Sequence, residues 1–466
     1  MDANFEELHA AVEGDATDAE ESFRAAVIGY HSQPDFHCRQ PVYGRYFDLR
    51  YGAETSVEHC KPQVPFLILK SDGDPEVLWL DVRRVQSVHL LFAGKSDQLA
   101  SRFGHVAIRL IVCPVEVETS EPCDVFLREH LVLGYQANVD ELSLDLWKAL
   151  TGGYRAYLYA HPFMDIYREY AISEFRDVYS LPLEMTAPRR EALVRGLSEL
   201  HWRFAGGYKF FTRNCGTLLQ DALRVLWPAY AHEPALASTR MRPDSFFERL
   251  RSTSLVRSEA LFELESAERN GYFFSSTKEY YEEAATVVVS ALSEPTFHNL
   301  ESFLDLLPET RKHLRERDGG FLKRLNSDSR LREAQLMIEE YAVLRSEREL
   351  MAAIGHYMQE HGIEERIAAL AGQITAEQWQ ILQECLVKPI RSRGKPPRSH
   401  EGIPQTLAAG EISTTTSLCS SESGRRSLRD LSGLIIEKDS DDYRRVRALF
   451  AYYNGSIDNV LALKGQ

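Results

Sequence analysis

The sequence lacks any uninterrupted apolar run of about 18 residues, the length that a helix needs to cross a bilayer. Residues 1–23 are acidic, and they lack the order of basic and then apolar residues that marks a secretory signal. We therefore expect no integral membrane segment. The sequence by itself favours a cytoplasmic location.

Positive charge is also scarce. The chain of 466 residues has 54 lysines and arginines against 69 aspartates and glutamates, which gives a net charge of −15 and a pI near 5.5. A protein that binds nucleic acid through its phosphates needs a basic surface. We therefore expect no nucleic-acid partner.

Cysteine is infrequent and widely spread. The seven cysteines are Cys38, Cys60, Cys113, Cys123, Cys215, Cys385 and Cys419. Their number is odd and no C-x-x-C pair occurs, which argues against a disulfide-rich scaffold and against a structural zinc site. Bridges between Cys38 and Cys60, and between Cys113 and Cys123, are open alternatives if the compartment is oxidising. Nothing in the sequence indicates a metal ion or a cofactor, and we expect none.

Short segments rich in β-branched and aromatic residues begin near residue 62, and turn residues separate them. Strands are predicted at 64–70, 76–80, 87–92, 105–112, 123–135, 154–163 and 177–183. Helices are predicted at 162–174 and 187–205, with a third that begins near Cys215. This mixture predicts an α+β domain over residues 62–235.

The rest of the chain has other patterns. Residues 36–52 are aromatic-rich and are expected to form a loop that follows an acidic, helical start. Charged segments with apolar residues at three- and four-residue steps predict helices beyond residue 240. The predicted division is an N-terminal extension at 1–61, a mostly α-helical domain at 240–390, a disordered linker rich in Ser, Thr, Gly and Pro at 391–430, and a partly helical tail at 431–466.

The stretch "FFTRNCGTLLQDALRVLW" contains the first candidate for chemistry. Its apolar residues are spaced as in an amphipathic helix, and Cys215 falls in the first turn. Free backbone N–H groups and the helix dipole favour a thiolate at that position. Cys215 is therefore a candidate nucleophile. The alternative is that it is a small buried hydrophobic residue.

The second candidate is His105 in "SRFGHVAIRLIV", at the start of a predicted strand. Alternation along the strand places His105, Ala107 and Arg109 on one face. A thiol needs a base to become a good nucleophile near neutral pH, and histidine is the usual one. The alternative is a half-buried histidine that bonds a backbone carbonyl.

Three segments from Ser87 to Trp227 resemble a known family in order and spacing: "SRFGHVAIRL", "FMDIYREYAISEFRDVYSLPLEMTAPRREALVRGL" and "YKFFTRNCGTLLQDAL". The family is the N-terminal domain of the bacterial lipoprotein N-acyltransferases of the Lnb type. The resemblance implies a permuted papain-like fold of the NlpC/P60 superfamily. It also implies that Cys215 is the nucleophile and His105 the base, and that the protein is periplasmic.

Other residues follow from the same resemblance. Asn214 matches the family's asparagine–cysteine pair and is counted with the catalytic residues, as is Arg109. Residues proposed to contact substrate or to orient the imidazole are Ser101, Arg102, Gln136, Asn138 and Tyr208. The third residue, which would orient the imidazole, stays open between Gln136, Asn138 and Arg109, and each is also an ordinary structural polar residue.

The chemistry implied is a cysteine-dependent acyltransferase or hydrolase that acts on an ester or amide through a thioester. The expected substrate is an acyl-lipid or an acylated peptide or protein, and the helical domain is expected to select it or to bind a protein partner. One alternative is a papain-like peptidase or peptidoglycan amidase. Another is a binding or regulatory module without catalytic activity.

Overall fold

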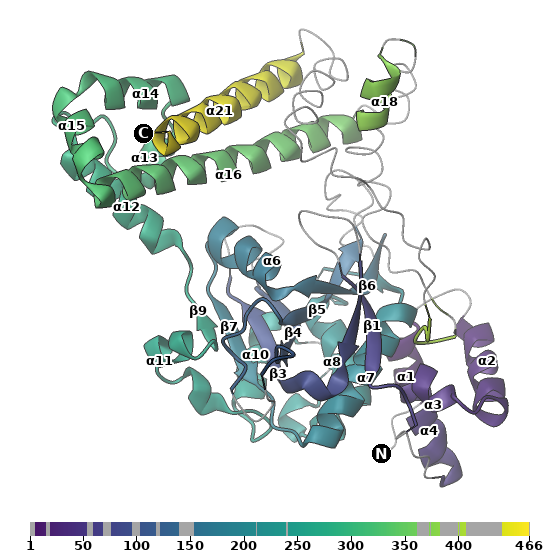
Figure 1. Ribbon diagram of the computed structural model, residues 1–466. Coiled ribbons are helices and arrows are strands. Elements are labelled where there is room, and N and C mark those ends of the chain that lie inside the picture. The colour runs from purple at the N-terminus through teal and green to yellow at the C-terminus, as the bar shows by residue number, and fades with distance from the viewer. Residues whose placement is uncertain are drawn as a thin grey trace. The chain divides into compact units, whose positions relative to one another are not determined.

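The computed structural model describes residues 5–14, 19–53, 59–68, 76–95, 103–117, 122–138, 153–210, 212–238, 241–360, 372, 374–382, 399, 401–406 and 440–465. The chain forms two compact units (Figure 1). The first unit consists of residues 1–139, 144–275 and 392–416, and the second of residues 140–143, 276–391 and 417–466.

A mixed sheet forms the centre of the first unit. Its strands are β1 (Gln63–Ile68), β2 (Glu76–Asp81), β3 (Val85–Ala93), β4 (His105–Val112), β5 (Leu131–Asn138), β6 (Tyr154–Pro162), β7 (Val178–Pro182), β8 (Gly206–Tyr208) and β9 (Phe273–Phe274). The order is β2-β1-β6-β5-β4-β3-β7-β9, with β8 paired to β6. Only the pair of β1 with β6 is parallel among these strands.

Strand alternation gives the sheet two covered faces. One face contributes Phe92, Val106 and Ile108 to the main core, which includes apolar residues of α7 (Ala187–Arg203) and α8 (Cys215–Leu226). Each such side chain stabilises the fold by about 1.5–3 kcal/mol when it is fully buried. The opposite face packs against α6 (Phe163–Tyr167) and against the π-helical segment Arg168–Ser173.

The N-terminal residues belong to the first unit and are largely helical. Their helices are α1 (Phe5–Val12), α2 (Ala19–Ser32), α3 (Phe36–Arg39) and α4 (Pro41–Tyr51). The prediction of a loop at 36–52 is therefore wrong. Pro41 occupies the first position of α4, where no N–H is needed, and Tyr43 and Phe47 are buried. Glu13 forms a buried ion pair with Arg203 of α7, which ties this region to the sheet's helical layer.

The first unit also extends beyond residue 240, where the sequence predicts a second domain. Helices α9 (Pro228–Ala231), α10 (Pro243–Arg251) and α11 (Leu264–Arg269) precede β9. Strand β9 pairs with β7, and Phe246 and Leu250 of α10 are buried in the main core. This part of the first unit therefore extends to residue 275, because these short elements complete the sheet and its core.

Two further predictions are corrected in the first unit. The strand predicted at 123–135 begins only at Leu131, because 122–130 forms turns in which the His130 ring contacts the Cys123 carbonyl. The linker predicted as disordered at 391–430 contains an ordered part at 401–406, where Ile403 is buried and its N–H donates to the Arg39 carbonyl. The rest of that stretch lies outside the described residues, except for Ser399.

The second unit is helical, as predicted. Its helices are α12 (Lys278–Ala291), α13 (Leu300–Leu304), α14 (Pro308–Arg317), α15 (Gly319–Ser327), α16 (Ser329–Glu360), α18 (Ala376–Leu382) and α21 (Asp441–Lys464). Helix α16 packs against α12 and α21. Helix α21 accounts for most of the tail at 431–466.

The cysteines within the described residues, which do not include Cys385 and Cys419, fall into two classes. Cys38 is bonded to Cys60 and Cys113 to Cys123, the pairings that the sequence left open. Cys215 is free and buried. Among the described residues, no helix has the length and apolar character needed to cross a membrane.

Candidate active site

Cys215 and His105 line one cavity of about 120 Å³ in the first unit. The cavity lies where the first turn of α8 meets the start of β4. Its lining consists of Phe103, Gly104, His105, Glu169, Tyr170, Glu174, Arg176, Tyr208, Phe210, Asn214, Cys215 and Pro243. The two candidate residues are 110 positions apart in the chain, so the sheet and its packed helix bring them together.

Cys215 is the first residue of α8 and is only 4% exposed. Burial raises the pKa of its thiol to about 11. Hydrogen bonds from the backbone N–H groups of Val106 and Gly216, and the positive charge of Arg176, act in the opposite direction. The thiol is therefore neutral at rest, in surroundings that already contain groups able to stabilise a thiolate.

Asn214 is the N-cap of α8. Its side-chain Oδ1 accepts hydrogen bonds from the N–H groups of Gly216 at 2.9 Å and Thr217 at 3.2 Å, while its Nδ2 donates to the Phe210 carbonyl. These bonds fix the start of the helix, and with it the position of the sulfur. The structure thus gives Asn214 a positioning role at the cavity.

His105 owes its position to the glycine before it. Gly104 has φ of +79°, and a Cβ there would lie 2.4 Å from the Phe92 ring and 2.7 Å from the Ala93 carbonyl oxygen. Only glycine fits both the left-handed backbone and this close approach. The chain therefore enters β4 with the imidazole at the sheet's end, beside the ring of Tyr170 at 5.9 Å between centroids.

The imidazole is neutral at rest. Burial, together with the smaller effects of the positive charges of Arg176 and His161, lowers the pKa of His105 to about 3. Because the thiol is also neutral, the site holds a thiol and an imidazole rather than a preformed ion pair. Such a pair reacts by proton transfer when a substrate arrives.

Arg176 is the charged residue that sequence reasoning missed. It is 2% exposed, and it donates to the carbonyls of Ala93 at 2.9 Å and Gly94 at 2.6 Å and to Glu174 at 2.7 Å. Its guanidinium also lies 4.7 Å from the centroid of the Tyr170 ring. The segment that resembles the family contains Arg176, but nothing in that segment distinguishes it from exposed arginines nearby.

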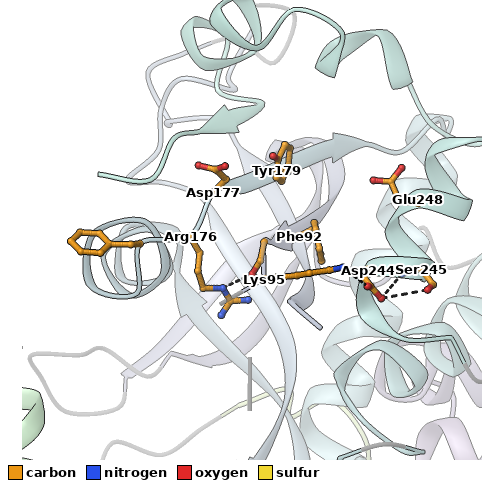
Figure 2. A pocket seen from close by; sticks show the side chains of 10 residues that line it. Phe92, Lys95, Arg176, Asp177, Tyr179, Asp244, Ser245 and Glu248 are labelled. Atoms are coloured by element: carbon orange, nitrogen blue, oxygen red, sulfur yellow. Dashed lines mark hydrogen bonds and ion pairs between the residues drawn. The ribbon is translucent and has the colours of Figure 1, made fainter. Parts of the chain in front are cut away.

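A second cavity, of about 560 Å³, has Arg176 in its wall as well (Figure 2). Phe92 and Tyr179 form aromatic parts of its lining, and Lys95 pairs with Asp244 at 3.1 Å. Phe175, also in the lining, has φ of +54°. A non-glycine residue with this backbone is uncommon, and such strain gathers at functional sites.

The other predicted site residues have different places. Tyr208 lines the Cys215 cavity, and its hydroxyl accepts a hydrogen bond from the Cys215 backbone N–H. Gln136 is half-buried on β5 and stands opposite Tyr157. Asn138 is buried and accepts a hydrogen bond from Tyr159 at 3.0 Å. Ser101 and Arg102 lie outside the described residues.

Arg109 is buried away from the cavity that contains His105. Its guanidinium donates to the carbonyls of Asp124 and Gly271 and to the Ser180 hydroxyl, and it contacts His130 at 2.7 Å. These bonds hold the turns at 122–130 and the chain before β9 against the sheet. The structure therefore gives Arg109 a structural setting rather than a place among the cavity-lining residues.

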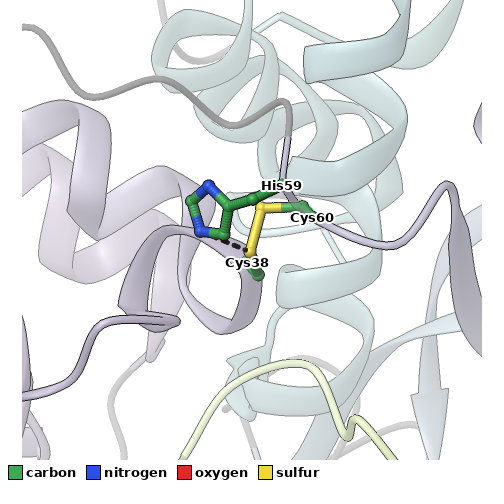
Figure 3. A group of neighbouring side chains, drawn as sticks. All are labelled: Cys38, His59 and Cys60. Carbon is green, nitrogen blue, oxygen red and sulfur yellow. Dashed lines mark hydrogen bonds between the residues drawn. A yellow bond between two sulfur atoms is a disulfide. The ribbon is translucent and has the colours of Figure 1, made fainter.

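Cys38, His59 and Cys60 form a cluster of the kind that holds metal ions (Figure 3). The ligand atoms of the three residues all lie within 4.8 Å of one another. In this structure the two sulfurs are bonded to each other at 2.02 Å. A disulfide has no thiolate to offer, so the oxidised cluster is not a metal centre.

Comparison with protein families supports one relationship. Residues 79–242 match the family model described as the Lnb N-terminal periplasmic domain. No curated protein and no solved structure matches the chain. The matched segment covers most of the sheet and all of α8, and it includes both His105 and Cys215. The resemblance to the Lnb family is therefore confirmed for residues 79–242 of this chain.

Proposed function

We propose that the first unit catalyses cysteine-dependent transfer or hydrolysis of an acyl group on an ester or amide. The observation that carries the proposal is the shared cavity: a buried thiol at a helix N-terminus and an imidazole at a strand start line the same small space. The match of this segment to the Lnb N-terminal domain supports the same chemistry.

The first step is proton transfer from the Cys215 thiol to His105 as the sulfur attacks the substrate carbonyl. The attack forms a carbon–sulfur bond, and His105 returns the proton to the leaving alcohol or amine. The product is a thioester on Cys215. The raised pKa of the thiol and the lowered pKa of the imidazole both favour the neutral reactants, so the reaction depends on stabilisation of the charge that develops.

The oxyanion that forms in this step needs hydrogen-bond donors. Asn214 already accepts from the N–H groups of Gly216 and Thr217. We therefore assign the oxyanion to the Tyr208 hydroxyl, which lines the cavity and accepts from the Cys215 N–H, so that its own proton is the one donated to the substrate. Removal of one such donor lowers kcat by about 10²–10³ in enzymes of this kind.

The second step is attack on the thioester by an amine, an alcohol or water. The larger cavity provides room for the acyl group or its acceptor, because Arg176 lies in its wall and in that of the catalytic cavity. Its lining of aromatic and charged side chains suits an amphiphilic substrate. An acyl-lipid or an acylated peptide is the substrate class that fits, and water in place of an amine gives hydrolysis.

The two disulfides bear on where this chemistry takes place. Cys38–Cys60 and Cys113–Cys123 would persist in an oxidising compartment and be reduced in the cytosol. We propose an oxidising compartment, in agreement with the periplasmic description of the matching family. Alkylation of free thiols in freshly lysed cells, followed by mass spectrometry, tests this: four protected cysteines are expected at these positions.

The decisive experiment compares the chain with Cys215→Ala after incubation with diacyl phospholipids, acylated peptides or unmodified peptides. Intact mass is expected to show an acyl adduct on the unaltered chain alone, and the variant is expected to lose at least about a thousandfold in turnover. Tyr208→Phe, which keeps the thiol, is the matched variant and should form the adduct slowly. Turnover retained by Cys215→Ala would overturn the proposal, and cleavage of unmodified peptides alone would favour the peptidase alternative.

A further inference from the structure

The Cys38–Cys60 disulfide differs from an ordinary structural bridge because the imidazole of His59 lies beside it. His59 Nε2 lies 3.5 Å from Cys38 Sγ (Figure 3). His59 is the neighbour of Cys60 in the chain, whereas Cys38 comes from α3, so the three ligand atoms reach one point from two segments.

This spacing is the one that a tetrahedral metal ion requires. A zinc ion has Zn–S bonds of about 2.3 Å and Zn–N bonds of about 2.0–2.1 Å, which places S and N ligands about 3.5 Å apart at tetrahedral angles. The same angles place two sulfurs about 3.8 Å apart. The His59–Cys38 separation already fits, all three ligand atoms lie within 4.8 Å of one another, and the sulfurs of Cys38 and Cys60 move apart once their bond is broken.

The surroundings also suit an ion. Cys38 and Cys60 are 7% and 8% exposed, so thiolates there are shielded, while His59 is exposed and leaves one side of the cluster open to solvent. Cys38 is held by a short helix whose Phe36 and His37 are also buried. A site with three protein ligands and an open fourth position therefore needs no large rearrangement.

The second disulfide provides a contrast within the same chain. Cys113 and Cys123 are 2% and 0% exposed and form a small apolar cluster with Ile111 and Val117. That bridge is packed among hydrocarbon, whereas the Cys38–Cys60 bridge has a nitrogen ligand beside it. The two disulfides are therefore not equivalent.

We propose that Cys38, His59 and Cys60 form a zinc-type metal site when their disulfide is reduced. A dithiol supplies two electrons and two protons to the bridge and becomes a disulfide itself, which leaves two thiols. Binding of a divalent ion then releases the two thiol protons and forms two metal–sulfur bonds and one metal–nitrogen bond. The cross-link between α3 and the segment before β1 thus persists in the reduced chain, with a metal ion in place of the sulfur–sulfur bond.

The test uses Co²⁺, whose thiolate complexes absorb through sulfur-to-metal charge transfer. The full chain is reduced with a trialkylphosphine under nitrogen and titrated with CoCl₂, beside the oxidised chain. One Co²⁺ per reduced chain and none per oxidised chain is expected. His59→Ala, a change at an exposed position, should weaken Co²⁺ binding by at least about tenfold. The double variant Cys113→Ser, Cys123→Ser should bind Co²⁺ as the reduced parent does.

Circular dichroism of each reduced protein shows whether it is folded, and addition of ZnCl₂ then gives a second readout. Zinc is expected to raise the melting temperature of the reduced parent, and to raise that of reduced His59→Ala by less. Equal cobalt binding by parent and His59→Ala, or no charge-transfer band in a folded reduced chain, would overturn the proposal. If the reduced chain is unfolded, failure of zinc to restore its structure overturns it as well.

Discussion

Each unit contains an arginine that is buried to the same extent, but the surroundings of the two side chains differ. Arg176 of the first unit and Arg311 of the second are both 2% exposed. Arg311 of α14 is enclosed by partners from two other helices and one loop: it bonds Glu339 of α16, the hydroxyls of Tyr452 and Ser456 of α21, and the carbonyl of Leu306, which precedes α14. Arg176 bonds two carbonyls and Glu174, yet it lies in the walls of two cavities.

The difference shows how context decides what a buried charge does. The bonds from Arg311 to Glu339, Tyr452 and Ser456 join α14 to α16 and α21, so the charge specifies how these three helices pack. Around Arg176 the charge reaches groups that can react, because it lowers the pKa of both His105 and Cys215. Burial alone does not distinguish the two roles, whereas the presence of a cavity does.

The largest expected effect is on the second unit. Arg311→Met leaves Glu339 buried without its ion-pair partner, which costs about 3–5 kcal/mol in the free energy of unfolding. Calorimetry of the full chain should show a lower melting temperature for the helical unit and an unchanged one for the sheet unit. Arg317→Met, at an exposed position of the same helix, is the control. Equal shifts in both transitions would mean that the network is not confined to one unit.

The next effect concerns acid stability of the first unit. Burial lowers the pKa of His201 to about 4, so the folded state stays unprotonated while the unfolded state binds a proton below about 6.5. Stability that depends on His201 is therefore present above pH 6.5 and is lost as the pH falls towards 4, by about 3 kcal/mol. Measured from pH 7 to 4, the unfolding free energy of His201→Gln should fall less steeply than that of the parent. His313→Gln in the second unit, where the side chain is exposed, should match the parent's slope.

Arg176→Met tests the comparison at the active site. Loss of the positive charge raises the pKa of the Cys215 thiol and of His105, so the rising limb of the activity–pH profile should move to higher pH. Activity at pH 7 is expected to fall by about ten- to a hundredfold. Arg190→Met, which removes a guanidinium bonded to the Val85 carbonyl, should leave the profile in place. A lower rate with an unmoved profile would give Arg176 a structural role only.

The smallest effect is expected at Gly134. A Cβ there lies 3.3 Å from the Ala107 Cβ, a tight contact, and 3.4 Å from His105 Nε2, so Gly134→Ala crowds the strand beside the imidazole. Activity should fall by about threefold, since small displacements of a base are felt in the rate. The melting temperature should hardly change. An unchanged rate would show that the imidazole does not depend on this contact.

The sequence predicted much of the fold because local pattern and tertiary environment agree there. Strand β4 runs from His105 to Val112, as alternation indicated, and α7 and α8 begin at the predicted residues. The predicted and observed secondary structures differ where tertiary contacts determine the conformation. Residues 36–39 and 41–51 are helical because Phe36, Tyr43 and Phe47 are buried in the main core of the first unit, and β9 is a strand of two residues that exists only because β7 offers a pairing edge.

The candidate site shows the same limit. Cys215 and His105 could be identified from the sequence because a helix N-terminus favours a thiolate and the start of a strand after a glycine can present an imidazole. The family resemblance then linked the two residues. Tyr170 lies within the π-helical segment and Arg176 follows it. No local sequence pattern shows that either side chain lines the cavity of Cys215, which comes 45 residues after Tyr170 and 39 residues after Arg176. Arg109 shares a strand face with His105, yet it lies four residues further along the strand, in different surroundings.

The ordered segment at 401–406 has a practical consequence for anyone who wishes to produce the first unit alone. Ile403 is 2% exposed, its N–H donates to the Arg39 carbonyl at 2.7 Å, and Glu401 pairs with the Arg39 side chain. A fragment that stops at residue 275 would expose the apolar surface that Ile403 covers, next to the Cys38 bridge. The excised fragment would therefore aggregate more readily than the whole chain, and co-expression of a peptide that spans 392–416 offers a remedy.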